Sequence, residues 1–493
     1  MRKITPNRSR KISALLICGA FLALLSPPAS AAAGRPLPAK PNIIFILADD
    51  LGWADVEFQG PKTRGRHETP HIDRLAAEGM NFERFYPGAS NCSPSRAVLM
   101  TGMYTPRHHV YMAGGWTDRR VNIAKMRWKV PKFEADESFN TLQSNINTIA
   151  PEWISVAEVL KPAGYVTARV GKWHLGNDLQ GFDESTSNGK PGNHSNSSYY
   201  NDDAVTERMT DVSVEFMTKN RDRPFFLYLA HYEPHGPLSA TKDRIEYYRK
   251  KFAALGDTDR NPIYAAMVEM VDISTGRILA ALEKLGLENN TVVIFSSDNG
   301  GWYELPNVPN NFPLRGSKGN YYEGGIRTPF IVRWPAAVAP GTRTDFPVNG
   351  VDLLPTLAEL AGGAVPTTQP VDGISIVPLL RGERLRERSI FFHFPLYLGG
   401  SPLPVHGGGS GGWRAVPSTT IMRGDWKLIQ YYEYDRHELF NLRDDIGETR
   451  DLAKAQPEMA KRLLAEVRAW TQEVKAPIPN VPNERFDPKA EKR

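Results

Sequence analysis

The stretch Asn42-Ile43-Ile44-Phe45-Ile46-Leu47-Ala48, followed at once by Asp49-Asp50, decides the fold expected for this chain. It is an uncharged run with several β-branched residues, which is typical of a strand buried on both faces in a parallel sheet. The two acids stand at the carboxyl end of that strand, and in open α/β sheets ligands bind in the crevice beyond this end. The stretch therefore predicts a parallel sheet with a functional site at its edge.

Further apolar runs resemble the first one, and patterns with helical spacing lie between them. The runs cover residues 165–170, 225–230, 291–296 and 329–334, and the helical patterns cover residues 71–78, 154–160, 204–216, 264–285 and 351–360. Strands that alternate with helices predict an α/β fold, in which helices sandwich a mostly parallel sheet.

The pattern changes toward the C-terminus. A Gly- and Pro-rich stretch at 399–412 precedes two short strand-like pieces, 418–422 and 427–432, and a helical pattern at 458–474. Residues 111–148 and 183–201 lack such patterns and are expected to form long surface loops. We therefore expect a large α/β domain over residues 34–385 and a smaller α+β domain over residues 386–493, which ends in an extended tail.

The first 33 residues have the layout of a secretory signal peptide. A basic start precedes an apolar run at 12–25 and a stretch of small residues that suits cleavage. The alternative is a membrane anchor, but the run is short for a span and Pro27-Pro28 would interrupt a helix. We expect a secreted or periplasmic protein without stable membrane insertion. Removing the leader also removes five basic residues and no acid, so the formal net charge falls from +5 to 0. A neutral protein argues against a nucleic-acid partner.

The chain contains two cysteines, Cys18 and Cys92, and Cys18 lies within the leader. After cleavage Cys92 has no partner, whereas exported proteins usually pair their cysteines or avoid them. A buried inert thiol is the commoner reading of a lone cysteine. The residues around Cys92 favour a functional role instead.

A second pair of metal-ligand types follows another apolar run. Asp298 and Asn299 come directly after residues 291–297, so they are expected to share one crevice with Asp49 and Asp50. Three carboxylates repel one another unless a cation lies between them, and oxygen ligands favour calcium or magnesium over zinc. The alternative is that Asp49 and Asp50 only cap a helix or turn.

Residues that suit an oxyanion accompany this expected metal site. Cys92-Ser93-Pro94-Ser95-Arg96 precedes a helical pattern, so Cys92 is expected near a helix N-terminus, where anions bind favourably. Cations follow the other strands or lie near them: Lys172, His174, His235 and Lys318. Each of these alone is typical of a solvated loop residue. Together, beside a metal, they predict a pocket for a tetrahedral oxyanion.

These motifs resemble those of the sulfatases. Cys92-Ser-Pro-Ser-Arg96 is similar to their C-x-P-S-R signature, and Gly171-Lys-Trp-His-Leu-Gly176 is similar to their second signature. Asp49-Asp50, Ser297-Asp-Asn-Gly300 and Lys318 fit the remaining pattern in order. The ending Glu438-Leu-Phe-Asn-Leu442, with Glu448 and Asp451-Leu452, is typical of sulfatase C-terminal regions, so the resemblance extends over about residues 40–475.

The resemblance implies an alkaline-phosphatase-like fold and one calcium ion as cofactor. Cys92 would be oxidised to formylglycine, an aldehyde that hydrates to a geminal diol. A formylglycine-generating or sulfatase-maturating enzyme would be the partner that makes it. The implied metal ligands are Asp49, Asp50, the modified Cys92, Asp298 and Asn299.

The resemblance also implies the roles of the catalytic residues in hydrolysing a sulfate monoester. A diol oxygen would attack sulfur while Asp298 helps to remove its proton. Calcium, Arg96, Lys172 and Lys318 would stabilise the sulfuryl oxygens. His235, with Lys318, would protonate the leaving alcohol. His174 would take the proton of the second hydroxyl, so that the aldehyde is regenerated.

Two alternative functions remain open from the sequence. One is a phosphomonoester or phosphonate monoester hydrolase of the same superfamily, because phosphate and sulfate share their geometry. The other is a non-catalytic glycan-binding protein that keeps a relic of the site. The export signal and the family together suggest a sulfated glycan substrate. Side chains that could contact it are His231, Trp302, His393, His406 and Arg414.

Overall fold

The computed structural model describes residues 38–59, 67–113, 123–129, 148–190, 199, 202–257, 260–302, 311–399 and 413–491. Every element named below belongs to one compact unit, Ala32–Arg493. The expected signal peptide, residues 1–33, lies outside the described residues, as does His406. No helix in the described ranges combines the length and the apolar character needed to span a bilayer.

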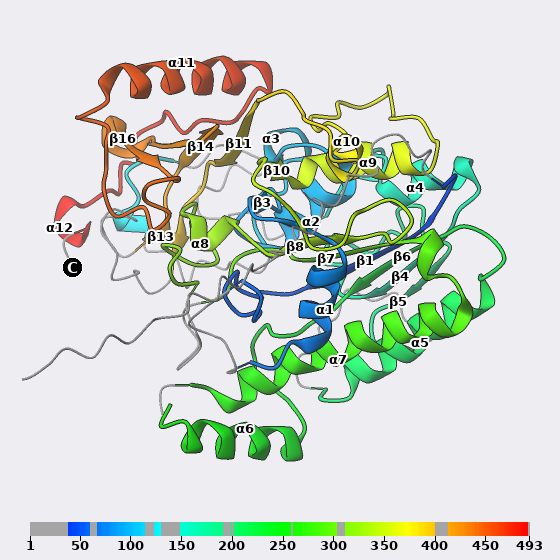
Figure 1. Cartoon of the computed structure of the whole chain (residues 1–493). Helices are drawn as coiled ribbons and strands as arrows, with labels where there is room; N and C mark the ends of the chain where they lie inside the picture. The colour runs from blue at the N-terminus through cyan, green and yellow to red at the C-terminus, as the bar shows by residue number, and fades with distance from the viewer. Residues whose placement is uncertain are drawn as a thin grey trace, which may run out of the picture. The chain divides into compact units, whose positions relative to one another are not determined.

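The central sheet has eight strands in the order β5-β4-β6-β1-β7-β8-β2-β9 (Figure 1). Neighbours from β5 to β7 run parallel, whereas β8 is antiparallel to both β7 and β2. In chain order the strands are β1 (Asn42–Ala48), β2 (Met80–Phe82), β4 (Val166–Gly171), β5 (Glu184–Thr186), β6 (Phe225–Ala230), β7 (Thr291–Ser297), β8 (Phe330–Arg333) and β9 (Thr342–Thr344).

The two faces of this sheet are buried by different helices. Alternate residues of β1 divide between them: Phe45 belongs to one apolar core and Ile46 to the other. The Phe45 core includes α2 (Cys92–Thr101), α4 (Val156–Leu160), α9 (Leu353–Leu360) and α10 (Val377–Leu380). The Ile46 core includes α1 (Pro70–Glu78), α5 (Val205–Lys219) and α7 (Pro262–Leu285). Burial on both faces explains why β1 is apolar throughout.

The predicted fold class is confirmed, because helices cover both faces of a large, mostly parallel sheet. The five apolar runs correspond to β1, β4, β6, β7 and β8. The antiparallel direction of β8 had no signal in the sequence, because a strand that is buried on both faces has the same composition in either direction.

A four-stranded antiparallel sheet follows toward the C-terminus. Its order is β11 (Ser389–Phe394), β14 (Ser418–Arg423), β15 (Trp426–Tyr431) and β16 (Arg436–Asn441). The long helix α11 (Pro457–Glu473) lies over this sheet in Figure 1, and its Leu463 and Val467 pack with Leu428 and Leu439. The other face packs on aromatic residues that include Tyr322, so the second sheet adjoins the segment that contains Lys318.

The remaining elements are short or peripheral. Two-stranded pairs join β3 (Phe85–Tyr86) with β10 (Val348–Asn349), and β12 (Leu398–Gly399) with β13 (Trp413–Ala415). The other α-helices are α3 (Thr105–His108), α6 (Lys242–Ala254), α8 (Glu323–Ile326) and α12 (Pro488–Glu491). The 3₁₀ turns are η2 (Ile123–Lys125), η3 (Lys161–Ala163), η4 (Glu288–Asn290), η5 (Gly350–Asp352) and η6 (Glu433–Asp435).

Candidate active site

The acids predicted at the strand ends lie together because the strands remain paired beyond their last regular residues. The Asp49 N–H donates to Glu233 O at 3.0 Å, and the Asp298 N–H donates to Ala48 O at 3.2 Å. The Asp50 N–H then reaches Asp298 Oδ1 at 3.2 Å. Asp50 has a φ of 63°, in the left-handed region that few residues other than glycine adopt. The turn after β1 thus directs both of its carboxylates to one crevice.

Cys92 is the first residue of α2, as its neighbours predicted, and its side chain is buried. Lys318 Nζ lies 3.0 Å from Cys92 Sγ and 2.7 Å from Asp50 Oδ1. Burial raises the pKa of the Cys92 thiol to about 12, although Lys172 and Lys318 act in the opposite direction. The thiol is therefore protonated at neutral pH. Ligand atoms of Asp49, Asp50, Cys92 and His235 lie within 4.8 Å of one another.

Three cationic side chains contact the three acids: Arg96, Lys172 and Lys318. Lys172 Nζ lies 2.5 Å from Asp49 Oδ2, and Arg96 donates to Asp298 Oδ2 from Nε at 2.9 Å. Arg96 is fully buried and also donates from Nη1 to Lys172 O at 2.6 Å. A buried guanidinium with these partners fixes the positions of Asp298 and of the backbone at Lys172 together.

The pKa values of the three acids shift in different directions. Burial opposes ionisation of Asp49 and Asp50, but their cationic neighbours outweigh it, chiefly Lys172 for Asp49 and Lys318 for Asp50, and both pKa values are lowered. Burial raises the pKa of Asp298, and Asp49 adds to this effect although Arg96 opposes it. Asp298 is thus the acid of the three with the greatest affinity for a proton.

Two predicted histidines lie near the charged groups of the site. His235 Nε2 lies 3.4 Å from Asp50 Oδ2, and its ring centroid lies 5.4 Å from that of Trp302. Burial lowers the pKa of His235 and, together with Lys172, Arg96 and Lys318, lowers the pKa of His174 well below its usual value. Both rings are therefore neutral at neutral pH, and a neutral imidazole can accept a proton.

Trp302 and Asn311 complete the surroundings of Lys318. The Lys318 ammonium lies 5.5 Å from the Trp302 ring centre, a cation–π distance. Asn311 was missed by the sequence reasoning. Its Oδ1 accepts the Gly301 N–H at 3.0 Å and its Nδ2 donates to Gly316 O at 3.2 Å, so it links the segment after Asp298 to the segment before Lys318. An asparagine in a polar loop gives no sequence signal of such a contact.

Two of the proposed substrate residues are buried histidines. His393 is buried in β11, where its ring nitrogens contact Thr419 Oγ1 at 2.8 Å and Pro477 O at 3.0 Å. His231 is fully buried, and burial lowers its pKa to about 3 with no contribution from the charges of the site. The contacts of the His393 ring thus lie with Thr419 and Pro477 and not with the cluster around Cys92.

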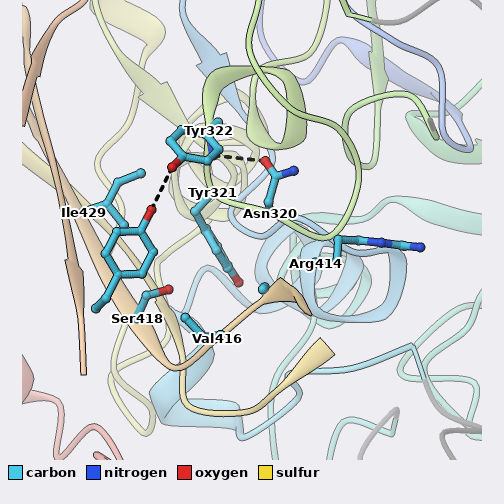
Figure 2. A pocket seen from close by; sticks show the side chains of 9 residues that line it. Asn320, Tyr321, Tyr322, Arg414, Val416, Ser418 and Ile429 are labelled. Carbon is cyan, nitrogen blue, oxygen red and sulfur yellow. Dashed lines mark hydrogen bonds between the residues drawn. The ribbon is translucent and has the colours of Figure 1, made fainter. Parts of the chain in front are cut away.

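Arg414 lies closer to the site. A Cβ placed on Gly319, the residue after Lys318, would be 2.4 Å from Arg414 Cδ, so the arginine stem packs directly on the segment that contains Lys318. Tyr321, Tyr322 and Val416 help to line a small cavity of about 20 Å³ beside it (Figure 2). Such a volume holds about one water molecule. The Arg414 guanidinium extends away from this cavity in Figure 2.

Comparisons with known proteins agree with this geometry. Residues 41–364 match the family model described as Sulfatase, and residues 317–474 match the model described as N-sulphoglucosamine sulphohydrolase, C-terminal. A sulfatase of Formosa agariphila is 30% identical, with 96% of this chain and 95% of that protein covered.

Two further relatives are named for carbohydrates or solved with one. An N-acetylgalactosamine-6-sulfatase of Canis lupus familiaris is 33% identical over 76% of this chain and 72% of that protein. A crystal structure of Ps i-CgsB in complex with k-i-k-neocarrahexaose has a TM-score of 0.68 and 28% identity, covering 89% of this chain and 94% of that one.

Proposed function

This chain belongs to the sulfatase family and is a sulfuric ester hydrolase, and from that premise we propose that it removes sulfate from a carbohydrate by means of a formylglycine made from Cys92 and one calcium ion. The observation that carries the proposal is the grouping of Asp49, Asp50 and residue 92, whose ligand atoms lie within 4.8 Å of one another beside Lys318.

The residues present fit a calcium ion. Asn299 Nδ2 donates to Asp50 Oδ1 at 2.6 Å, while its buried Oδ1 accepts no hydrogen bond from any residue in the described ranges. An amide oxygen held this way, beside the carboxylates of Asp49, Asp50 and Asp298, is the oxygen-rich donor set that calcium prefers. We assign these four residues and the modified residue 92 as its ligands.

When present, the formylglycine hydrate supplies the nucleophilic oxygen and the calcium ion neutralises charge on the sulfuryl oxygens. Asp298, held by Arg96 Nε at 2.9 Å and by the Asp50 N–H at 3.2 Å, accepts the proton of the nucleophile. Lys172, Lys318 and Arg96 place positive charge around the sulfuryl group, where charge develops in the transition state. The three acids and these three cations balance, so a bound divalent ion leaves a positive site that attracts a sulfate ester.

Two neutral histidines complete the proton transfers. His235 and Lys318 both contact Asp50, and His235 together with the Lys318 ammonium delivers a proton to the leaving alcohol. His174 has its pKa lowered by burial and by Lys172, so it is neutral at neutral pH, and its unprotonated ring nitrogen would accept the proton of the second hydroxyl.

The substrate class follows from the relatives and from the rim of the site. One relative is named for N-acetylgalactosamine 6-sulfate, and one related structure contains k-i-k-neocarrahexaose. Trp302 offers an aromatic face beside His235, suited to stacking on a sugar ring. Arg414, whose side-chain stem packs on Gly319, belongs to the residue type that suits a carboxylate or a second sulfate. A sulfated glycan matches both side chains.

The same proposal includes the route by which the protein matures. Residues 1–33 act as a signal peptide, and the protein is secreted or periplasmic. A formylglycine-generating or sulfatase-maturating enzyme converts Cys92.

One experiment tests the chemistry. Protein from the native host is digested, and the peptide that contains residue 92 is examined by mass spectrometry for replacement of the thiol by an aldehyde. The same protein is assayed on 4-nitrophenyl sulfate, 4-nitrophenyl phosphate and the 6-sulfates of galactose, N-acetylgalactosamine and N-acetylglucosamine. Aldehyde at residue 92 and hydrolysis of a sulfated sugar are expected. An intact thiol in active protein, or faster turnover of the phosphate than of every sulfate, would contradict the proposal.

A further inference from the structure

A second group of buried charges lies where the C-terminal sheet meets the segment that contains Lys318. We call residues 315–326 the lysine turn and Glu323, Arg327, Lys427 and Glu448 the buried ion cluster. Lys427 Nζ lies 2.9 Å from Glu323 Oε1 and 2.8 Å from Glu448 Oε1, and all three side chains are 0% exposed. Arg327 Nη1 donates to Glu323 Oε2 at 3.2 Å. Apolar residues often replace buried ion pairs without loss of stability, so stability alone does not account for these charges.

Glu448 fastens the lysine turn at two points. Its Oε2 accepts the Glu323 N–H at 2.7 Å, and its carbonyl oxygen accepts a hydrogen bond from Arg315 Nη1 at 2.8 Å. Arg315 O in turn accepts the Gly324 N–H at 2.7 Å, which closes the turn on itself. Glu448 has a φ of 51°, an unfavourable conformation for glutamate that persists only where the surroundings determine it strongly. The carboxylate therefore sits in a fixed place behind the turn.

The lysine turn contacts both halves of the active site through its backbone. The Lys318 N–H donates to Gly301 O at 3.1 Å, and the Gly319 N–H donates to Ser90 O at 2.7 Å, two residues before Cys92. A Cβ on Gly300 would lie 1.8 Å from Gly324 O, so the two backbones touch where no side chain fits. A displacement of the turn would therefore move Lys318 relative to both Cys92 and the segment that follows Asp298.

We propose that Glu448 and Lys427 are positioning residues for the sulfatase reaction: acting through Glu323, they hold the lysine turn so that Lys318 stays in contact with Asp50 and residue 92. Both residues contact Glu323, and neither contacts Cys92 or Asp50 in the hydrogen bonds and ion pairs of the described residues. The inference rests on the role proposed above for Lys318.

A double-mutant cycle tests this inference. E448A removes both carboxylate contacts, and we expect it to lower kcat/KM by about tenfold or more, because small displacements of catalytic groups are costly. E448Q keeps an acceptor for the Glu323 N–H and is expected to recover most of the loss. In a K318A background, E448A is expected to have no further effect, since the group that it positions is absent. The substrate is the one turned over fastest in the panel above.

A matched control separates positioning from general loss of stability. Arg423 on β14 pairs with Glu466 of α11 at 2.8 Å, so R423M also breaks an ion pair of the C-terminal sheet, and its kcat/KM is expected to stay within about twofold of the parent. Circular dichroism verifies that each variant is folded at the assay temperature. If E448A does not fold, E448Q takes its place in the cycle, with a smaller loss that again depends on Lys318.

The outcomes distinguish the two proposals. A loss from E448A that is equal with and without Lys318 overturns the positioning role, as does a parental kcat/KM in E448A. A parental kcat/KM in K318A overturns the proposed role of Lys318 and the inference with it. If K318A turns over too slowly to measure, the cycle is repeated on the affinity of the same substrate for Cys92→Ser protein, with the same expected dependence.

Discussion

The lysine turn contacts both the active site and the buried ion cluster. These two groups of buried charges differ in their exposure to solvent. In the buried ion cluster, Lys427, Glu323 and Glu448 are 0% exposed and contact one another directly. At the active site, His235 is 17% exposed and Lys318 is 9% exposed, although both contact Asp50.

The difference shows what each group is suited to. Asn299 Oδ1 in the active site accepts no hydrogen bond from the described residues, whereas Glu323 Oε2 in the ion cluster accepts one from Tyr86 at 3.0 Å and another from Arg327. A closed network fixes a geometry but offers nothing to a ligand. A partly open network with spare acceptors can bind a cation and an anion, so of these two groups the active site is the one suited to exchange with solvent.

The largest expected effect comes from removing the nucleophile of the active site, which is the partly exposed group. C92A should lower turnover by more than about ten-thousandfold, because it removes the residue that becomes the formylglycine. The ion cluster does not contact Cys92, so the thermal unfolding midpoint should change little. Steady-state rates and circular dichroism measure the two effects. Substantial activity in C92A would show that the nucleophile lies elsewhere.

Removal of calcium should come next in size. Dialysis against EGTA is expected to lower kcat by about a thousandfold, since metal stabilisation of developing charge supplies several kcal/mol. Added calcium should restore the rate and raise the unfolding midpoint with increasing concentration, whereas the ion cluster needs no metal. Full activity after EGTA treatment, with metal content verified by elemental analysis, would exclude a required calcium ion.

Loss of an ion pair in the buried ion cluster should lower the free energy of unfolding. K427M leaves Glu323 and Glu448 buried without their shared cation and is expected to cost about 3–5 kcal/mol of unfolding free energy. R423M, which breaks the more exposed pair with Glu466, should cost about 1 kcal/mol or less. Urea unfolding of the two variants measures the difference. Equal losses would mean that burial does not distinguish these pairs.

The smallest expected effect is a pH dependence. Burial raises the pKa of Glu448 to about 7, with Glu323 adding to this and Lys427 opposing it. A raised pKa means that the folded state holds the proton more tightly, so this contribution to stability is full below about pH 4.5 and is lost as the pH rises through 7. E448Q does not titrate. Its stability relative to the parent should therefore increase over this interval by on the order of 1 kcal/mol or more. A constant difference in urea unfolding between pH 4.5 and 8 would contradict the shift.

The sequence could predict the acids of the active site because they lie at the ends of strands. Asp49 and Asp298 directly follow apolar runs, and parallel strands bring such positions to one edge. The partners of Lys427 could not be predicted in the same way. A lysine in a short strand is typical of a solvent-facing position, and here it is buried because Glu323 and Glu448, distant in sequence, meet it.

The histidines show the same limit of what sequence can predict. His235 follows a parallel strand and lies at the crevice, as its position predicted. His393 could be proposed as a substrate contact only from its residue type, and the packing of β11 places it against Thr419 and Pro477 instead. Residue type suggests chemistry, but topology decides which side chains meet.

The contact of β15 with the lysine turn limits how this enzyme can be re-engineered. A chain shortened to end before β11 would lack Lys427 and Glu448 and would leave Glu323 buried without them or exposed to water. The C-terminal sheet is therefore not a detachable accessory, and a minimal enzyme made from the α/β domain alone would be compromised. Exchanging this sheet between relatives to alter specificity would require transferring the residues around Glu323 with it.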